Sequence, residues 1–274
     1  MTSQTKSVAN QDLILAARQG LIPVRDHALG GFGNMLRKEL GQWWGTRTWW
    51  VQILIWVLIL NGITTIVMLT EGVPPNEKLI VVVQTFLPMA VGIVAIGTVI
   101  AAQGAIVGEK ELGTAAWVLS KPASRSAFIL AKLVSLTLGF WITALIIPAI
   151  LFVITARILI PTPLDLMQFL AGLAVAMLSQ LFFVALSLML GTFFNSRGPI
   201  AGIGIAIIMA GLLLKGFIPQ AVQIFTPFPL GDISAGLALG TPLPSIWWVP
   251  IAAVSAWIVV MTAVALWRFN REEF

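Results

Sequence analysis

Residues 86–107 read FLPMAVGIVAIGTVIAAQGAIV and contain no charged side chain. A helix that crosses the hydrocarbon of a bilayer needs about 20 mostly apolar residues, because the hydrocarbon is about 30 Å thick and each helical residue rises about 1.5 Å. The stretch is continuously apolar and lacks the period-2 alternation of a membrane barrel strand. It is therefore predicted to be a transmembrane helix.

The rest of the chain has the same character. Hydrophobic residues make up 58% of the 274 residues and charged residues only 10%, whereas a soluble domain carries about 25% charged residues. Six stretches are long enough to cross a bilayer: Trp49 to Leu69, Phe86 to Val107, Leu133 to Thr155, Phe169 to Phe193, Pro199 to Ile218 and Ile246 to Trp267. We expect an all-α membrane protein with six spans, in which a polar segment 1–34 precedes one transmembrane domain, 35–274.

The distribution of Lys and Arg predicts the orientation, because these residues stay preferentially in the cytoplasm. With the N-terminus inside, thirteen of the sixteen cations fall on the cytoplasmic side and only Lys78, Arg157 and Lys215 fall outside. Both termini are therefore expected in the cytoplasm, for a multi-pass protein of the cell inner membrane.

The residues before the first span have helical amphipathic spacing. The apolar stripe consists of Leu36, Leu40, Trp43 and Trp44. The polar face carries Arg37, Lys38 and Glu39. This pattern predicts a helix lying in the membrane interface, with cations that suit anionic lipid headgroups. The alternative is a simple extension of the first span.

Residues 108–126, GEKELGTAAWVLSKPASRS, form the most polar connection between two spans. Gly113 is expected to end one helix, and Thr114 can cap a short new helix that carries Trp117. Ser124 can then cap the third span. Such a helix, projecting from the membrane with charges and one aromatic residue, suits docking of a cytoplasmic partner. A merely solvated connector is the alternative.

The connection from Pro219 to Ser245 holds five prolines but is largely apolar. Its apolar pieces are too short to span, but they can dip into the outer leaflet where protein buries their backbone. We expect a re-entrant hairpin over the outer end of a pathway, with a lipid-facing lid as the alternative.

The spans hold no charged residue near their centres, which disfavours ion-coupled transport. Their milder polar residues include Asn61, Gln103 and Gln180, which either line a pathway or form packing hydrogen bonds between helices. No phosphate-binding loop, HExxH pair or GxSxG turn occurs, so no catalytic residue, cofactor site or metal site is expected in this chain. The chain also has no cysteine, and its cations flank apolar runs, which points to a membrane rather than to nucleic acid.

The middle of the sequence resembles the type-2 ATP-binding-cassette permeases. The residues that carry the resemblance are Glu109, Glu111, Gly113, Thr114, Leu119, Ser120, Pro122, Ser124, Arg125 and Lys132. The RKEL sequence of the interfacial helix, the six-span plan and the apolar outer segment also look like that family. The resemblance covers the chain from about Met35 to its end.

The resemblance implies a half-transporter that pairs with a second copy or a homologous permease. Two nucleotide-binding subunits would bind ATP and Mg and drive the pair. The implied coupling residues are Glu109, Glu111, Gly113, Thr114 and Trp117, supported by the interfacial helix.

Three functions remain open at this stage. The leading hypothesis is export of a hydrophobic or amphiphilic substrate, because the spans offer apolar walls without fixed charge. The first alternative is a mechanotransmission or assembly subunit that acts on an outer partner without solute flux. The second is a membrane-embedded enzyme, which the missing acid, base and metal groups disfavour.

Overall fold

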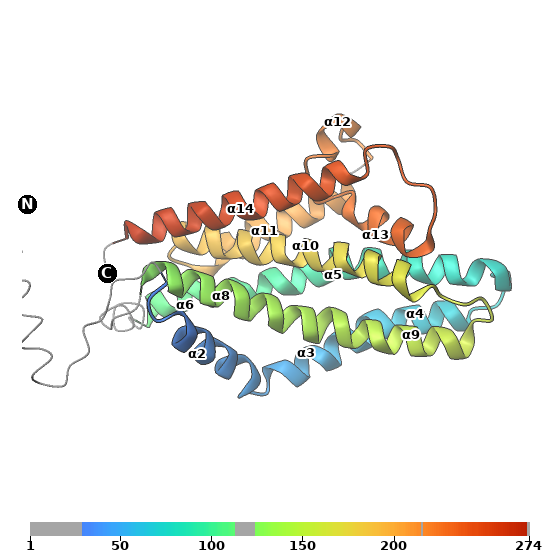
Figure 1. Ribbon diagram of the computed structural model, residues 1–274, viewed down its shortest axis with the longest axis horizontal. Helices are drawn as coiled ribbons and strands as arrows, with labels where there is room; N and C mark the ends of the chain where they lie inside the picture. Colours follow the sequence, from blue (N-terminus) through green and yellow to red (C-terminus); the bar gives the residue numbers. More distant parts are fainter. Residues whose placement is uncertain (1–28, 113–123, 215, 273–274) are drawn as a thin grey trace, which may run out of the picture.

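The computed structural model describes residues 29–112, 124–214 and 216–272, and all regular elements in these ranges are helical (Figure 1). Two of the elements, η1 and η2, are π-helical turns inside longer helices. The elements are α2 (Phe32–Trp44), α3 (Thr48–Trp56), η1 (Val57–Asn61), α4 (Gly62–Leu69), α5 (Pro75–Ala102), α6 (Gly104–Glu111), α8 (Arg125–Phe140), η2 (Trp141–Ile146), α9 (Ile147–Leu159), α10 (Leu166–Phe193), α11 (Arg197–Leu213), α12 (Gln220–Gln223), α13 (Leu230–Leu239) and α14 (Trp248–Asn270).

Five helical segments of the described chain are long and apolar enough to cross a membrane. They are Thr48–Leu69, Glu77–Glu111, Arg125–Leu159, Leu166–Phe193 and Trp248–Asn270. The all-helical membrane fold is thereby confirmed, and the five segments coincide with the predicted first four spans and the last one. The predicted fifth span corresponds to α11, which has 17 residues and is shorter than these segments. A sixth crossing therefore stays a prediction.

The long helices run side by side and alternate in direction along the bundle (Figure 1). The ends of α6, α10 and α14 and the beginnings of α8 and α11 meet at one end of it, which we call the charged end. Hydrogen bonds establish this meeting: Lys110 contacts Thr192 and Glu272, Arg125 contacts Asn270, and Arg197 contacts Glu111. The helix α2 also packs here, against α8.

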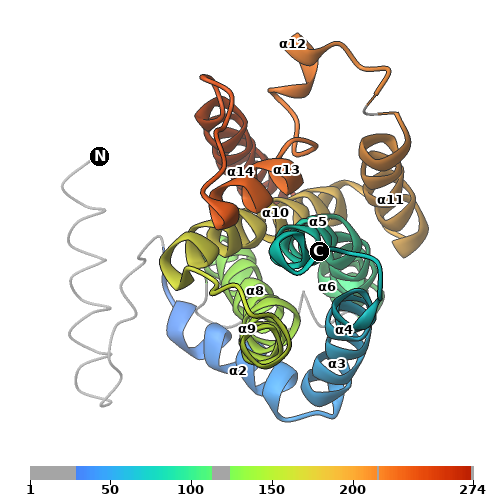
Figure 2. The ribbon, with the colours of Figure 1, turned by 90° about the vertical axis from the view of Figure 1, so that its right-hand side faces the viewer.

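Helix α10 occupies the middle of the bundle and packs against α5, α8, α11, α13 and α14 (Figure 2). Its buried residues include Gly172, Ser179, Gln180 and Phe183. Three buried phenylalanines join α5, α9 and α10, with ring centroids 4.4 Å apart for Phe86 and Phe152 and 5.4 Å apart for Phe152 and Phe169. Close aromatic packing at the centre fixes these three helices as one core.

The predicted outer hairpin contains two short helices, α12 and α13. The second packs closely on α10, because a Cβ at Gly172 would lie 2.3 Å from the carbonyl oxygen of Ser234. The Ser234 hydroxyl donates to the Gly172 carbonyl at 2.7 Å, so the two backbones touch where a side chain is absent. Because α13 is buried against α5 and α10 and does not span the bundle, the contacts are compatible with a re-entrant segment, which stays a prediction.

Two helical segments extend beyond the predicted apolar spans and end close to where their polar flanks were expected to end them. The second continues past Val107 to Glu111, just before Gly113, and the third begins at Arg125, directly after Ser124. The Ser124 hydroxyl accepts a hydrogen bond from the Ala127 amide at 3.0 Å, which confirms the predicted cap. The charged side chains at these helix ends contact other helices or the residues after α14.

Candidate functional site

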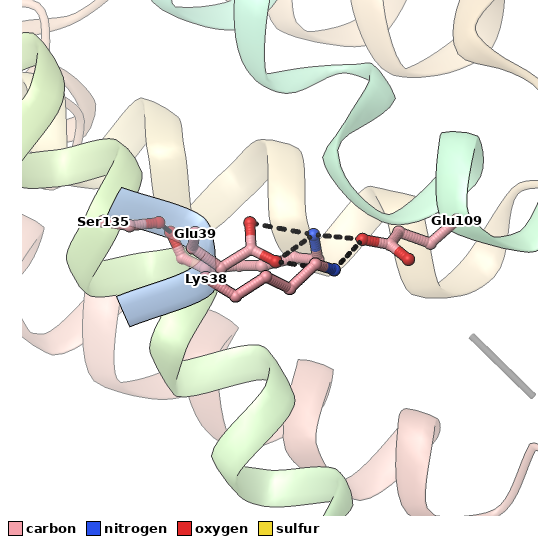
Figure 3. Close-up of polar contacts among 5 residues, drawn as sticks. Lys38, Glu39, Glu109 and Ser135 are labelled. Atoms are coloured by element: carbon pink, nitrogen blue, oxygen red, sulfur yellow. Dashed lines mark hydrogen bonds and ion pairs between the residues drawn. The ribbon is translucent and has the colours of Figure 1, made fainter. Parts of the chain in front are cut away.

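Four charged residues from three helices lie together at the charged end (Figure 3). They are Lys38 and Glu39 of α2, Glu109 of α6 and Lys132 of α8, and we call them the ion cluster. Lys132 Nζ lies 3.0 Å from Glu39 Oε1 and 3.2 Å from Glu109 Oε1. Lys38 Nζ lies 2.8 Å from Glu109 Oε1 and 3.4 Å from Glu39 Oε1. Each cation therefore contacts both carboxylates, and α2, α6 and α8 are joined electrostatically.

A close contact between α2 and α8 sets the position of the cluster. The indole of Trp43 lies over Gly139, where a Cβ would come within 2.5 Å of the ring. The same indole packs edge-on against Phe140, with centroids 5.1 Å apart. Trp43 was expected to face the membrane interface, but the structure buries it because α2 packs against α8 where Gly139 leaves room for the indole.

Because the ion cluster is largely buried, its charged side chains depend on one another for stability. The side chain of Lys132 is only 4% exposed, and a buried ammonium without a carboxylate partner would be strongly unfavourable. For Lys38, burial alone lowers the pKa, but the hydrogen bond to Glu109 and the charge of Glu39 outweigh it, so the pKa lies above the usual 10.5. Lys38 therefore keeps its positive charge at neutral pH.

The two residues after Glu109 contact other elements. Lys110 Nζ donates to Glu272 Oε1 at 2.6 Å, beyond the end of α14, and to the carbonyl of Thr192 in α10 at 3.4 Å. Arg197, at the start of α11, donates from Nη2 to Glu111 Oε2 at 3.1 Å. Three consecutive side chains at the end of α6 thus connect it to α2, α8, α10, α11 and the C-terminal segment.

The other flank of the undescribed segment 113–123 is also held in place. Arg125 Nη1 donates to the carbonyls of Asn270 and Glu272 at 2.9 and 2.6 Å. A cation at this place satisfies carbonyls that the end of α14 leaves without an intrahelical partner. The Ser124 amide donates to the Gly30 carbonyl at 2.9 Å, which connects this flank to the residues before α2.

The other predicted site residues have separate positions. Gly113, Thr114 and Trp117 lie outside the described residues, so the predicted coupling helix stays a prediction. Arg37 is exposed on α2, as expected for a residue that faces headgroups. Trp44 packs near Trp49, with ring centroids 6.0 Å apart.

The three polar residues of the spans differ from one another. Gln180 is buried, accepts from the Thr98 hydroxyl at 2.8 Å and donates to the Ala90 carbonyl at 2.8 Å, which favours the packing alternative. Asn61 is buried, and neither amide atom has a hydrogen-bond partner within the described chain. Gln103 is half-buried at the junction of α5 and α6.

Sequence reasoning missed the pairing of Lys132, Arg125 and Arg197. The first two appeared in the family resemblance and all three in the count of cytoplasmic cations, but their partners are 23 to 147 residues away along the chain. The one available signal is the unusual concentration of both charge signs in residues 37–39 and 109–111. Together the two triplets carry three positive and three negative charges, which is compatible with pairing but does not identify the pairs.

A pocket of about 530 Å³ opens beside the ion cluster. Its polar lining includes Lys38, Glu39, Glu109, Lys132, Ser135 and Arg197. Its apolar lining includes Trp43, Ala101, Ala105 and Leu136. Among the described residues, no group of three or more His, Cys, Asp and Glu side chains is arranged to hold a metal ion.

Long apolar helices pack into a bundle, and ion pairs join the helix ends at its charged end. This is the architecture of a multi-pass membrane protein. A family model described as "ABC-2 family transporter protein" matches residues 4–274, and the chain belongs to this family. It is accordingly a transmembrane permease subunit of an ATP-binding-cassette transporter, a class that works with an ABC ATPase partner and is generally non-catalytic. No match to the chain was found among curated proteins.

Proposed function

We propose that this permease moves a hydrophobic or amphiphilic substrate out of the cell, driven by ATP hydrolysis in a separate nucleotide-binding subunit. The observation that supports the proposal most is the set of contacts flanking segment 113–123. Glu109, Lys110 and Glu111 contact α2, α8, α10, α11 and the C-terminal segment. A force applied to that segment would reach most of the bundle through these ion pairs.

We call residues 113–123 the docking segment. To transmit a force, it must be connected on both sides to stiff helices. On one side, α5 and α6 form one helical segment up to Glu111, and on the other, α8, η2 and α9 continue from Arg125 to Leu159. Each flank is also hydrogen-bonded at the C-terminal end of α14, through Asn270, its last residue, or Glu272, two residues beyond it. In the proposed cycle, nucleotide-driven closure of the ATPase pair displaces the docking segment. The attached helices then move as packed bodies and change which side of the membrane the pathway opens to.

The orientation and the assembly are parts of the same proposal. The charged end faces the cytoplasm, because nine of the thirteen Lys and Arg residues expected inside lie among the described residues, in or beside the helices that meet at this end, and such residues favour that side. Helix α11 completes six crossings, so both termini are cytoplasmic. A second copy of the chain or a homologous permease pairs with it to complete the pathway.

An ATPase-association experiment tests the docking assignment. The variants Glu111→Lys and Gly113→Pro change the segment and its flank, whereas Glu77→Lys alters a carboxylate at the opposite end of the bundle. We expect the first two variants to insert into the membrane but to lose co-purification with the cognate ATPase and substrate-coupled ATP hydrolysis. Glu77→Lys should retain both. Wild-type association and transport in the first two variants would show that the ATPase docks elsewhere.

The mechanotransmission alternative makes a different prediction in reconstituted vesicles. An exporter shows ATP-dependent flux of a solute or lipid with only the permease and the ATPase present. A mechanotransmission subunit shows ATP hydrolysis that rises only when an outer protein is added, without flux. These outcomes distinguish an exporter from a mechanotransmission subunit even when the ATPase docks as proposed.

A further inference from the structure

The pocket beside the ion cluster has the size of a ligand site. Its volume of about 530 Å³ lies in the range of about 300–1,000 Å³ that small-molecule sites occupy. It lies between α2 and α8 on one side and the start of α11 on the other, with α6 between them. In the bundle, α5 and α6 lie between α3 and α4 on one side and α11 on the other (Figure 2). The pocket is therefore at the charged end of a face that no other described helix covers.

The charges around this pocket are arranged by depth. The carboxylates of Glu39 and Glu109 are 11% and 13% exposed, whereas the side chains of Lys38 and Arg197 are 38% and 56% exposed. With Lys132 at 4% exposure, the inner charged side chains are Lys132, Glu39 and Glu109, and the two outer ones, Lys38 and Arg197, are both cations. A molecule that approaches from the membrane surface meets cations first, so the rim favours an anion.

Arg197 is held in a position that suits anion binding. Its guanidinium lies along Gly104 and Gly108 of α6, where added Cβ atoms would come within 3.5 and 3.6 Å of it. Nη2 donates to Glu111, and in the described chain the donors on Nε and Nη1 are left for a ligand. A guanidinium with a fixed plane and free donors binds phosphate or carboxylate oxygens in pairs. Gly104 and Gly108 thus leave room on α6 for the Arg197 guanidinium, whereas their spacing in the sequence suggests close packing of another helix.

The pocket also has apolar lining residues. They include Trp43, Ala101, Ala105 and Leu136, and Ala101 is on the exposed side of α5. We infer that the pocket binds an amphiphile with an anionic headgroup, whose headgroup contacts Arg197 and Lys38 and whose chain lies along the small residues of α5 and α6. The inference rests on the proposed function, for which it names the substrate class: anionic amphiphiles of the cytoplasmic leaflet.

Equilibrium binding to the permease without its ATPase tests this inference. The purified full chain in a neutral detergent is titrated with phosphatidylglycerol, with phosphatidylcholine of the same chains, or with glycerol 3-phosphate, and retained ligand is counted by native mass spectrometry. We expect phosphatidylglycerol to bind about tenfold more tightly than phosphatidylcholine, a difference of about 1.4 kcal/mol, because both lipids carry the phosphate but the rim cations repel the ammonium of choline. Glycerol 3-phosphate should not displace it, because the chain contributes to binding.

Three variants locate the site. Arg197→Gln and Lys38→Gln should each weaken phosphatidylglycerol binding severalfold without changing phosphatidylcholine binding, and Ala105→Leu should weaken both by filling part of the pocket. The matched control Arg157→Gln removes an exposed cation at the opposite end of the bundle and should have no effect. Equal binding of the two lipids, or phosphatidylglycerol binding that survives Arg197→Gln, would overturn the inference. Displacement by glycerol 3-phosphate would show a phosphate site and likewise reject the amphiphile.

These results are independent of ATPase docking. A permease that binds phosphatidylglycerol at Arg197 but does not bind its ATPase through Glu111 would contradict the proposed coupling alone. A permease with normal ATPase association but no lipid selectivity would contradict the substrate class alone.

Discussion

The ammonium of Lys132 lies 3.2 Å from the carboxylate of Glu109, and this contact joins α8 to α6 across the segment proposed to dock the ATPase. The same ammonium lies 3.0 Å from Glu39. One nearly buried cation therefore determines how the helices before and after the docking segment sit relative to α2. If it is removed, two carboxylates share Lys38 as their remaining partner within the cluster.

A double-mutant cycle measures this contact. Lys132→Met should destabilise the fold by about 3–5 kcal/mol, because the loss of one partner of a buried pair leaves charge uncompensated. Glu109→Gln together with Lys132→Met should cost less than the sum of the single changes, with a coupling of about 0.5–3 kcal/mol. The free energy of unfolding is measured in mixed micelles by tryptophan fluorescence. Additive costs would mean that the two side chains do not interact.

A second prediction concerns the packing of α2 on α8. Gly139→Ala places a methyl group where the Trp43 indole lies, 2.5 Å away, so overpacking should cost about 1–3 kcal/mol. Gly62→Ala is the matched control, because a Cβ there meets nothing within 4 Å and the position is also helical. The thermal midpoint of unfolding in detergent should fall for the first variant and stay constant or rise for the second. A similar midpoint for both would mean that the indole moves aside at no cost.

The sequence predicted the parts of the structure that depend on local composition. The uninterrupted apolar runs indicated the helices, since a bilayer leaves few other ways to satisfy the backbone, and Ser124 was recognised as a cap from its residue type and place. The helix end before Gly113 agrees with the expectation as well. The neutralisation of Glu109 and Lys132 depends on residues of α2 far away in the chain, and no local pattern contains that information.

The same reasoning explains what was missed at the site. The residues Glu109, Glu111 and Lys38 were singled out as site residues. Their partner Lys132 appeared only in the family resemblance and the cation count, and Arg197 only in the cation count. Sequence spacing predicts contacts within one helix, whereas these pairs join different helices and become visible only when the bundle is packed. The alternatives for Gln180 were left open for the same reason, and its contacts with α5 now favour packing.

The packing role of Gln180 yields a third prediction. Gln180→Leu removes the hydrogen bonds to Thr98 and to the Ala90 carbonyl, and such bonds between membrane helices contribute about 0.6 kcal/mol on average and up to about 1.7. The unfolding free energy should fall by about this amount while coupled transport is retained. Ser187→Ala is the control, because that hydroxyl donates within its own helix, to Phe183. Loss of transport at unchanged stability would instead place Gln180 in the pathway.

The final prediction concerns the side of the membrane that the charged end faces. The chain contains no native cysteine, so a single engineered thiol reports on its own position without a background. Asn195 is exposed next to Arg197 at the charged end, and Thr70 is exposed at the end of α4, at the opposite end of the bundle. In right-side-out vesicles, a membrane-impermeant maleimide should label Thr70→Cys and leave Asn195→Cys unlabelled, and in inverted vesicles the pattern should reverse. Labelling of Asn195→Cys from outside would put the ion cluster and the segment it flanks out of reach of a cytoplasmic ATPase. In that case neither the docking proposal nor the assignment of the pocket to the cytoplasmic leaflet would hold, because both depend on this orientation.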